Sequence, residues 1–403
     1  MLRQAGTFIA LFQSVALTIA YSQSDPAARQ DRSKPTDASS GTAPNDQEPT
    51  ESRSPAAQAA PAPTWSIGPI DLSGLVDGYY SFNANHPASG FNQLRNFDFR
   101  ANQFSLNMAK LTMQHDADPI GFRVDLGFGR AFDTIHAAEQ APDIFRYLEQ
   151  AFVSVKPKGW GGFQADFGEF VTTAGAEVIE SKDNWNYSRS LLFSWAIPYY
   201  HFGLRTSMPI GKSFSAGVQL VNGWNNIEDN NSGKTVGLTA TYTKAKFAWT
   251  NTWYSGPEKA TTNKGHRNLY DSVLTLTPTD KVNAYLNFDY GQERALDRSL
   301  NRWIGFAGAV RISPTKWFAI TPRGEYFYDA NGFNTGRTQK LNEVTVTGEF
   351  KMAQGMLTRL EYRRDNSDAS FFQRGATPDA AENQNTFLVA VIAFFGPKRQ
   401  SPN

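Results

Sequence analysis

The chain of 403 residues contains no cysteine, no surplus of either charge and no long apolar run. Without cysteine there is no disulfide framework, no thiol chemistry and no lipoprotein anchor. A net charge of +1 excludes the basic footprint of a nucleic-acid-binding protein. No segment reaches the roughly 18 apolar residues that a membrane-spanning helix needs. A membrane β-barrel remains compatible with these absences, because only alternate residues of its strands face lipid.

What the sequence does contain is an alternation of short and long connections from residue 69 to residue 395. The short turns include 116–119, 211–213, 278–281 and 313–316, and the long loops include 83–101, 131–145, 170–198, 256–268, 291–301, 330–340 and 364–384. A soluble sandwich gives no reason for this order, whereas a membrane barrel places all short turns at one end. We therefore expect an all-β fold, a transmembrane up-and-down antiparallel β-barrel with short periplasmic turns and long extracellular loops.

Three regions follow one another along the chain. Residues 1–22 are predicted to be a signal peptide, since Arg3 precedes an apolar stretch and Ala20-Tyr21-Ser22 offers small residues for cleavage. A membrane anchor helix is the alternative, although the apolar stretch is short. Residues 23–64 are rich in Pro, Ala and Ser and are predicted to be a disordered periplasmic linker, or a tether to the cell wall or a partner. Residues 65–403 are predicted to form the barrel.

The barrel region is predicted to contain about sixteen strands. They are expected near 69–82, 102–115, 119–130, 146–157, 162–169, 199–210, 214–223, 234–243, 246–255, 269–277, 282–290, 302–312, 317–329, 341–350, 355–363 and 385–395. An even number returns the chain to its starting side, so both termini are expected in the periplasm. Sixteen strands also leave room for an aqueous channel, whereas eight would be filled by side chains.

Two-residue alternation supports these strands. In 122–128 and 343–350, apolar residues share one face and charged or small residues share the other. An Arg on the lipid face would cost about 2–4 kcal/mol near the midplane, so the charged faces are assigned to a wet lumen. Residues 147–155 have no unambiguous register, and Ala109-Lys110 suggests a bulge.

Aromatic residues are abundant and concentrate near the predicted strand ends. The last strand, 386–395, presents the outward stripe Phe387, Val389, Val391, Ala393 and Phe395, typical of bacterial barrels. Residues at positions suited to interfacial girdles are Trp160, Trp224, Trp249, Trp253, Trp303, Trp317, Tyr326 and Tyr328. Ordinary β-propensity would also place aromatics in strands, so each one taken singly decides nothing.

The third long loop, 170–198, is predicted to narrow the lumen, by analogy with general porins. Its candidate constriction residues are Glu177, Glu180, Lys182, Asp183 and Arg189, and the candidate lumen-wall residues are Arg123, Asp125, Arg130, Arg205, Arg323, Glu325, Arg359, Glu361 and Arg363. Opposed charges across a constriction create a transverse field that filters small polar solutes. The alternative is that these charges solvate a wide lumen or pair with one another. Gly168 and Gly175 permit sharp turns at the loop's entry.

Several stretches of the chain resemble the OmpL-like β-barrel porins of bacterial outer membranes. They are 183–193, 196–205, 221–225, 323–327 and 360–365, and the similarity covers nearly all of residues 70–395. The resemblance implies an outer-membrane barrel that passes small solutes. It implies no substrate and transfers no site residue.

Motifs of enzymes and metal sites are not found in the sequence. The five histidines are scattered, and 228–231 lacks the full pattern of a calcium loop, so neither a metal nor a cofactor site is expected. His201 and Ser207 lie on one predicted strand, separated by about 20 Å of extended chain, which excludes them as a local catalytic pair. No catalytic residue is therefore assigned, and the chain is expected not to be an enzyme.

The sequence thus predicts a porin that allows passive diffusion of small hydrophilic solutes or ions through a water-filled lumen narrowed by loop 170–198. A non-conducting anchor barrel with a plugged lumen is the alternative, and a barrel phospholipase or protease is a weaker one. The expected partners are outer-membrane lipid and lipopolysaccharide, small polar solutes, the barrel assembly machinery and, by analogy, two further copies in a homotrimer. No nucleic acid is expected as a partner.

Overall fold

The computed structural model describes residues 65–137, 139, 143–353 and 355–396, so the predicted signal peptide and linker lie outside the described residues. The strands are β1 Ser66–Ile67, β2 Ile70–Asn83, β3 Phe104–His115, β4 Ile120–Phe128, β5 Leu148–Val155, β6 Gln164–Val171, β7 Tyr200–Ile210, β8 Phe214–Val221, β9 Thr235–Lys244, β10 Phe247–Lys259, β11 Thr262–Thr279, β12 Val282–Arg294, β13 Leu300–Ile312, β14 Phe318–Asp329, β15 Gln339–Ala353, β16 Met356–Ser367, β17 Phe372–Arg374, β18 Thr377–Ala381 and β19 Asn383–Phe395. The short helices are α2 Arg130–Ile135, η2 Asp143–Tyr147, η3 Ser181–Asp183 and η4 Leu192–Ala196. No helix among these residues is long and apolar enough to cross a membrane.

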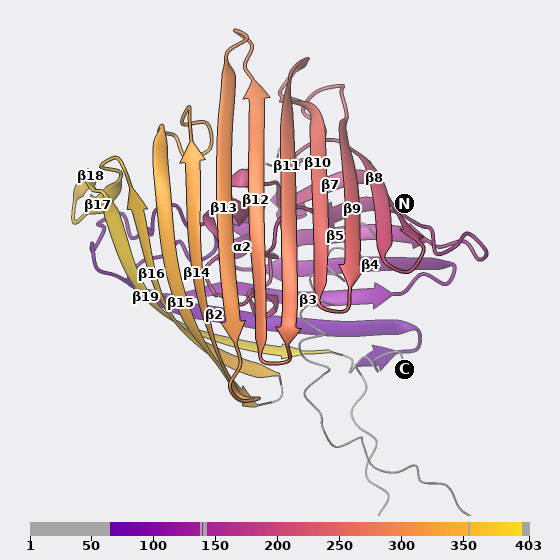
Figure 1. The fold of residues 1–403 in the computed structure, drawn as a ribbon, viewed down its shortest axis with the longest axis horizontal. Coiled ribbons are helices and arrows are strands. Elements are labelled where there is room, and N and C mark those ends of the chain that lie inside the picture. Colours follow the sequence, from indigo (N-terminus) through magenta and orange to yellow (C-terminus); the bar gives the residue numbers. More distant parts are fainter. Residues whose placement is uncertain (1–64, 138, 140–142, 354, 397–403) are drawn as a thin grey trace, which may run out of the picture.

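Sixteen antiparallel strands, β2 to β16 together with β19, form one closed barrel (Figure 1). Each strand pairs with the next along the chain, and β19 returns to pair with β2 through partners such as Thr386 and Asn83. The short β1 adds two residue pairs to β2. The predicted fold class and the predicted strand number are both confirmed.

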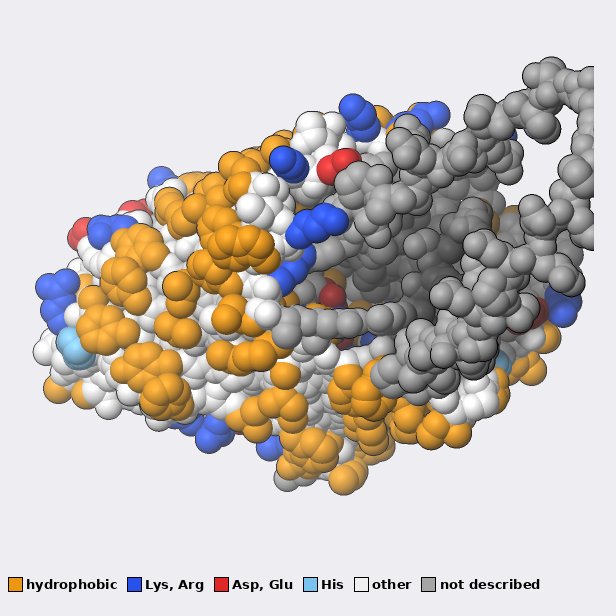
Figure 2. All heavy atoms as spheres, turned by 90° about the horizontal axis from the view of Figure 1, so that it is seen from below, with side chains coloured by type: hydrophobic (Ala, Val, Ile, Leu, Met, Phe, Trp, Pro, Cys, Tyr) orange, Lys and Arg blue, Asp and Glu red, His pale blue; other side chains and the backbone are white. Residues whose placement is uncertain are grey.

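The two faces of the wall differ as the alternation predicts. On β15, Glu343, Thr345 and Thr347 are buried inside the barrel, while Val344 and Val346 between them are exposed outside. The last strand presents its predicted outward stripe from Phe387 to Phe395. Figure 2 shows hydrophobic side chains spread over the outer wall, with Lys and Arg among them mainly near its edges. An apolar exterior of this kind suits a bilayer rather than water.

The long-loop end of the barrel is more structured than the sequence suggests. β10 extends to Lys259 and β11 begins at Thr262, so the predicted loop 256–268 is wrong and a tall hairpin stands there instead (Figure 1). The predicted loop 291–301 is likewise shortened by β12 and β13. The reason is that Asn268, Arg267 and His266 still pair with β10 after the apolar alternation has ended, and backbone hydrogen bonds carry no hydropathy signal.

Two bulges explain the strands whose register was hard to read. In β3, Asp77 pairs with Met108 and Gly78 with Leu106, so the extra residue is Asn107 and the predicted bulge at Ala109-Lys110 is wrong by about two positions. In β5, Asp125 pairs with Gln150 and Leu126 with Leu148, which leaves Glu149 as the extra residue. A bulge turns two successive side chains toward one face and so breaks the two-residue alternation.

Two predicted girdle tryptophans lie inside the barrel. Trp303 is fully buried and its indole N–H donates to the carbonyl of Ala196 at 3.1 Å. Trp224 packs edge-on against Trp303, with ring centroids 6.3 Å apart. The alternation in β13 already placed Trp303 on the inward face, since Arg302 and Ile304 beside it point out. By contrast Trp160, Trp249, Trp253 and Trp317 are exposed on the outside.

Candidate pore constriction

The connection between β6 and β7, residues 172–199, folds into the barrel and crosses its lumen; we call it the inner loop. Its side chains and backbone bond to β2 and β3 on one side and to β14, β15 and β16 on the other. Two glycines shape its entry. Gly168 has φ +135°, and a Cβ there would lie 2.2 Å from the carbonyl oxygen of Ala151. Gly175 has φ +91° and faces Ile197. Other residues would strain both positions.

Three arginines from β14 and β16 hold the far side of the inner loop by its backbone. Arg359 donates to the carbonyls of Ser181 at 2.5 Å and Asn186 at 3.1 Å, and also to that of Asn184. Arg363 donates to the carbonyl of Arg189 at 2.6 Å, and Arg323 to that of Ser188 at 2.7 Å. All three guanidinium groups are fully buried. They therefore satisfy the carbonyl groups of a non-repetitive segment that has no sheet partner of its own.

Carboxylates complete the attachment on this side. Glu361 accepts from the backbone N–H groups of Tyr187 at 2.6 Å and Ser188 at 3.0 Å. Within the inner loop, Glu177 lies 2.7 Å from the guanidinium of Arg323 and also accepts from the backbone N–H of Ser190. Hydrogen bonds to charged groups contribute about 1.5–3 kcal/mol each. The β14–β16 side thus holds the inner loop through many buried hydrogen bonds and salt bridges.

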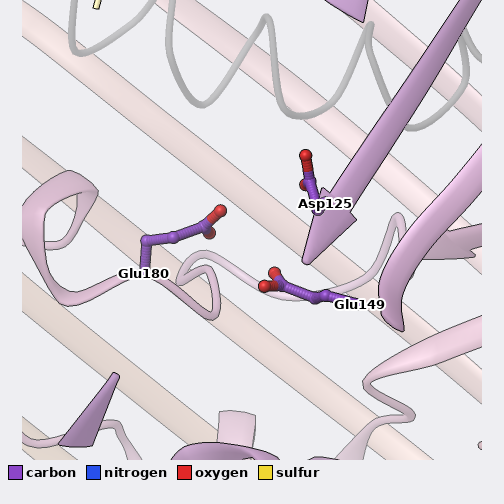
Figure 3. Close-up of side chains that lie close together, drawn as sticks. All are labelled: Asp125, Glu149 and Glu180. Atoms are coloured by element: carbon purple, nitrogen blue, oxygen red, sulfur yellow. The ribbon is translucent and has the colours of Figure 1, made fainter. Parts of the chain in front are cut away.

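On the near side, Asp77 of β2 accepts from the hydroxyls of Ser181 at 2.6 Å and Tyr187 at 2.8 Å. Beside it the carboxylates of Asp125, Glu149 and Glu180 converge from β4, β5 and the inner loop, each with an oxygen within 4.8 Å of the others (Figure 3). Three carboxylates could hold a metal ion, but the ammonium group of Lys110 lies 3.0 Å from Asp125 and 3.0 Å from Glu149 and also binds Glu180. The cluster already has its own cation.

Neighbouring ammonium groups stabilise the negative charge of Glu180. Burial alone would raise the pKa of Glu180, but the ammonium groups of Lys110 and Lys182 outweigh it and lower the pKa to about 2. Glu180 is therefore ionised at neutral pH and its bond to Lys110 joins the inner loop to β3. We call this bond the Lys110–Glu180 latch.

Solvent-accessible charged side chains lie around Glu180, where the inner loop faces β3 and β4. The side chains of Arg123, Lys182 and Asp183 are 25%, 29% and 41% exposed, and Glu180 is 15% exposed. Lys182 lies 2.5 Å from Asp183, and Arg123 pairs with Asp125 at 2.8 Å. This region, where the inner loop faces β3 and β4, places both signs of charge beside accessible space.

The remaining predicted residues have other surroundings. Arg189 is buried, lies over the ring of Phe97 at 4.6 Å and donates to carbonyls of its own loop, including that of Tyr187. Arg205 lies over Phe170 at 4.2 Å and 3.4 Å from Asp166, on the β6–β7 wall. Glu325 lies 3.2 Å from Arg323 and accepts from the backbone N–H of Leu192. These three charges are enclosed by protein rather than aligned across an open gap.

Arg130 is not a wall residue, because β4 ends at Phe128. It begins helix α2, is half exposed and pairs with Asp133 at 2.9 Å. Gly129, with φ +116°, breaks the strand just before it. The strand was therefore predicted two residues too long, which carried Arg130 onto the wall.

Sequence reasoning missed Lys110, Asp77 and Glu149 as residues that organise the site, and Glu343, which lies 3.4 Å from the guanidinium of Arg323. Asp77 and Glu343 sit at inward positions of strands with clean alternation, so the pattern that found Arg123 could have found them. Lys110 and Glu149 each lie close to a bulge, where the inward face changes register. Their pairing spans three strands, from β3 to β5, and leaves no local mark in the sequence.

Comparison with known proteins now identifies the family. The family model of "Putative beta-barrel porin-2, OmpL-like" matches residues 69–395, most of the chain. The chain belongs to this family. It is an outer-membrane porin, and the predicted resemblance is confirmed. No curated protein sequence matches the porin.

Three solved structures that are similar to this porin are distant from it in sequence. An anion-selective porin from Comamonas acidovorans has a TM-score of 0.57 at 10% identity, covering 81% of this chain and 99% of that one. The outer membrane channel DcaP of Acinetobacter baumannii has 0.55 at 10%, covering 81% and 97%. The trimer form of OmpT from Vibrio cholerae has 0.54 at 12%, covering 81% and 99%. At these identities the likeness supports the barrel fold alone.

Proposed function

We propose that this porin lets small hydrophilic solutes and ions diffuse passively past the inner loop, on the side that faces β3 and β4. The observation that carries the proposal is the partial exposure of Arg123, Lys182 and Asp183, in contrast to the closed arginines of β14 and β16. Flux down a gradient needs no cofactor. Selectivity then depends on charges that a passing solute can meet.

Both signs of charge meet at this passage. Arg123 and Lys182 supply the positive side, and Glu180 and Asp183 supply the negative side. Such a pair of opposed groups orients dipolar solutes and lowers the barrier for small polar molecules more than for apolar ones. Within the predicted constriction set, we assign Glu177 and Arg189 the separate task of keeping the inner loop folded, since both bind its own backbone.

The direct test is single-channel recording of the refolded porin in planar bilayers. We expect stepwise conductance and a reversal potential that departs from zero in a salt gradient. Swelling of liposomes in sugars of increasing size would give the cut-off of the passage. Insertion of folded barrels without any conductance step would overturn the proposal and favour the anchor barrel instead.

The orientation and assembly of the porin belong to the same proposal. We place the short turns and both termini in the periplasm and the long loops outside the cell, as in other single-chain outer-membrane barrels. A homotrimer is supported by analogy with the trimer form of Vibrio cholerae OmpT. Light scattering in detergent tests it, with a mass of three chains expected. Lipid and lipopolysaccharide would surround the exposed apolar wall, and the terminal aromatic Phe395 would be read by the assembly machinery.

We propose no enzymatic role. His201 and Ser207 both point inward from β7 and are buried, whereas a barrel phospholipase needs its Ser and His on the outer wall near lipid. His201 is also held by a 2.7 Å hydrogen bond between its Nδ1 and the carbonyl oxygen of Gly223. Hydrolysis of phospholipid vesicles by the purified porin would contradict this assignment.

A further inference from the structure

Two aspartates face each other inside the barrel, away from the Lys110 cluster. Asp271 of β11 and Asp289 of β12 are direct partners in the strand register, and both are completely buried. Side chains of register partners on one face of an antiparallel pair lie side by side, so the two carboxylates are neighbours. Two carboxylates this close cannot both carry their charge in a buried setting unless something positive separates them.

The surroundings of this aspartate pair supply no positive side chain. Among the described residues, no Lys, Arg or His is paired with either carboxylate, and the groups that act on them are carboxylates, an amide and a backbone N–H. The Lys110 cluster makes the contrast plain, since there a buried ammonium group contacts all three acids. The same barrel thus neutralises one acidic group internally and leaves the other without an internal cation.

The oxygen atoms favour a metal ion over a single shared proton. Three buried oxygens of the pair have no hydrogen-bond partner, namely Oδ1 of Asp271 and both carboxylate oxygens of Asp289. One shared proton would satisfy two of these three atoms and leave one orphaned. A cation placed between the carboxylates can coordinate all three. Buried polar atoms without partners are costly, so the cation accounts for the arrangement more completely.

The pair is also connected to the inner loop. The side-chain amide of Asn287 donates to Asp271 at 2.8 Å, while its oxygen accepts from the backbone N–H of Ala176 at 3.1 Å. Thr252, the partner of Asp271 on β10, donates to the carbonyl of Thr173. Residues 173–176 form the entry of the inner loop. A cation held by the aspartates would therefore stiffen the wall at the point where this loop departs.

We propose that Asp271 and Asp289 bind a hard divalent cation of the Ca²⁺ type between β11 and β12. Carboxylate and amide oxygens are the ligands that Ca²⁺ takes in proteins, and its flexible coordination tolerates a site with few protein ligands and added water. The site fixes the entry of the inner loop to the wall. It is independent of the passage beside β3 and β4, so it stands even if the porin proves silent in bilayers.

The test is metal retention by the folded porin in detergent. Protein dialysed against CaCl₂ and then against metal-free buffer is analysed for bound Ca²⁺, with MgCl₂ as a parallel arm. We expect about one Ca²⁺ per chain in the native protein, loss of it in Asp289→Asn, and retention in Asp297→Asn, whose carboxylate is exposed in the β12–β13 loop. Glu180→Gln should also retain it, because Lys110 occupies that cluster.

A second measurement needs no mutation. Adding a chelator should lower the heat-denaturation midpoint of the native porin, and Ca²⁺ should restore it. Retention of no divalent cation by the native protein, or equal retention by native protein and Asp289→Asn, overturns the proposal. So does a midpoint that ignores chelator but rises on acidification in the native protein and not in Asp289→Asn, because the pair would then share a proton. If Asp289→Asn does not fold, the chelator result on the native chain decides alone.

Discussion

The two sides of the inner loop are held by similar side chains in different surroundings. Toward β14–β16, Arg323, Arg359 and Arg363 are sealed against backbone carbonyls and carboxylates. Toward β3–β4, Arg123 and Lys182 pair with carboxylates but remain open to water. The role of an inward arginine is thus set by what lies opposite it. Where a loop covers the wall, the arginine is structural; where the wall is uncovered, its charge is available to solutes.

We expect the largest loss of stability when an arginine on the β14–β16 side of the inner loop is removed. Replacing Arg359 with Ala removes donors to the carbonyls of Ser181 and Asn186 and leaves the buried Glu349 with Arg311 alone of its two cations. We expect the free energy of unfolding to fall by about 3–5 kcal/mol, as for other broken buried pairs. Urea unfolding followed by tryptophan fluorescence measures it. Arg364→Ala is the matched control, because Arg364 is on the same strand but faces outward; an equal loss in both variants would remove the distinction between the faces.

The latch on the other side should contribute less. Lys110→Met leaves Asp125, Glu149 and Glu180 without their shared ammonium group, although Arg123 still neutralises Asp125. We expect a loss of about 3 kcal/mol in the same assay. The exposed Lys158→Met should change stability by less than about 1 kcal/mol. Native-like stability of Lys110→Met would mean that the inner loop does not depend on this attachment.

Ion selectivity should respond on the open side only. Arg123→Ala should shift the reversal potential toward cations and Asp183→Asn toward anions, each by roughly fivefold in permeability ratio, since a charge a few Å away in water contributes about 1 kcal/mol. Bilayer recordings in a KCl gradient measure both. Asp297→Asn, on an outer loop, should leave the ratio unchanged. Unaltered selectivity in both inner variants would move the passage elsewhere in the lumen.

The smallest effect that we expect is the loss of stability at low pH when Glu180 becomes protonated. The pKa of Glu180 is lowered from 4.5 to about 2, because Lys110 and Lys182 outweigh the effect of burial. Since the folded-state pKa is the lower one, the latch contributes its full stability above about pH 4.5 and loses it as the pH falls toward 2. The titration of Glu180 should therefore not change the heat-denaturation midpoint between pH 7 and pH 5. Glu180→Gln should lower the midpoint at pH 7 and remove part of its fall below pH 4.5.

Much of the barrel could be predicted from local pattern. Alternation in strands such as β4 and β15 fixed which side chains face lipid, and the order of short and long connections gave the strand number. It failed where one residue is inserted, at Asn107 and Glu149, because a bulge reverses the pattern that the prediction depends on. It also failed where strands continue as polar ribbons, as in β10 and β11.

The candidate site was harder to predict for a different reason. The two-residue alternation predicts that Arg323 and Arg363 point inward. It does not predict that the backbone of residues 188 and 189 lies opposite them. That information resides in contacts between segments more than a hundred residues apart. The sequence therefore indicated the right loop and the right charges, while the division between sealed and open charges needed the three-dimensional arrangement.

The pairing of β19 with β2 constrains how the barrel assembles. The strand that ends at Phe395 completes the ring by bonding to the strand that begins at Ile70. Until that last segment is in place, β2 and β16 both expose unpaired edges, which in a bilayer have nothing to bond with. Partial products of translation thus have no stable spanning form, and contacts of such long separation make closure slow. Closure of the barrel therefore waits for β19, residues 383–395.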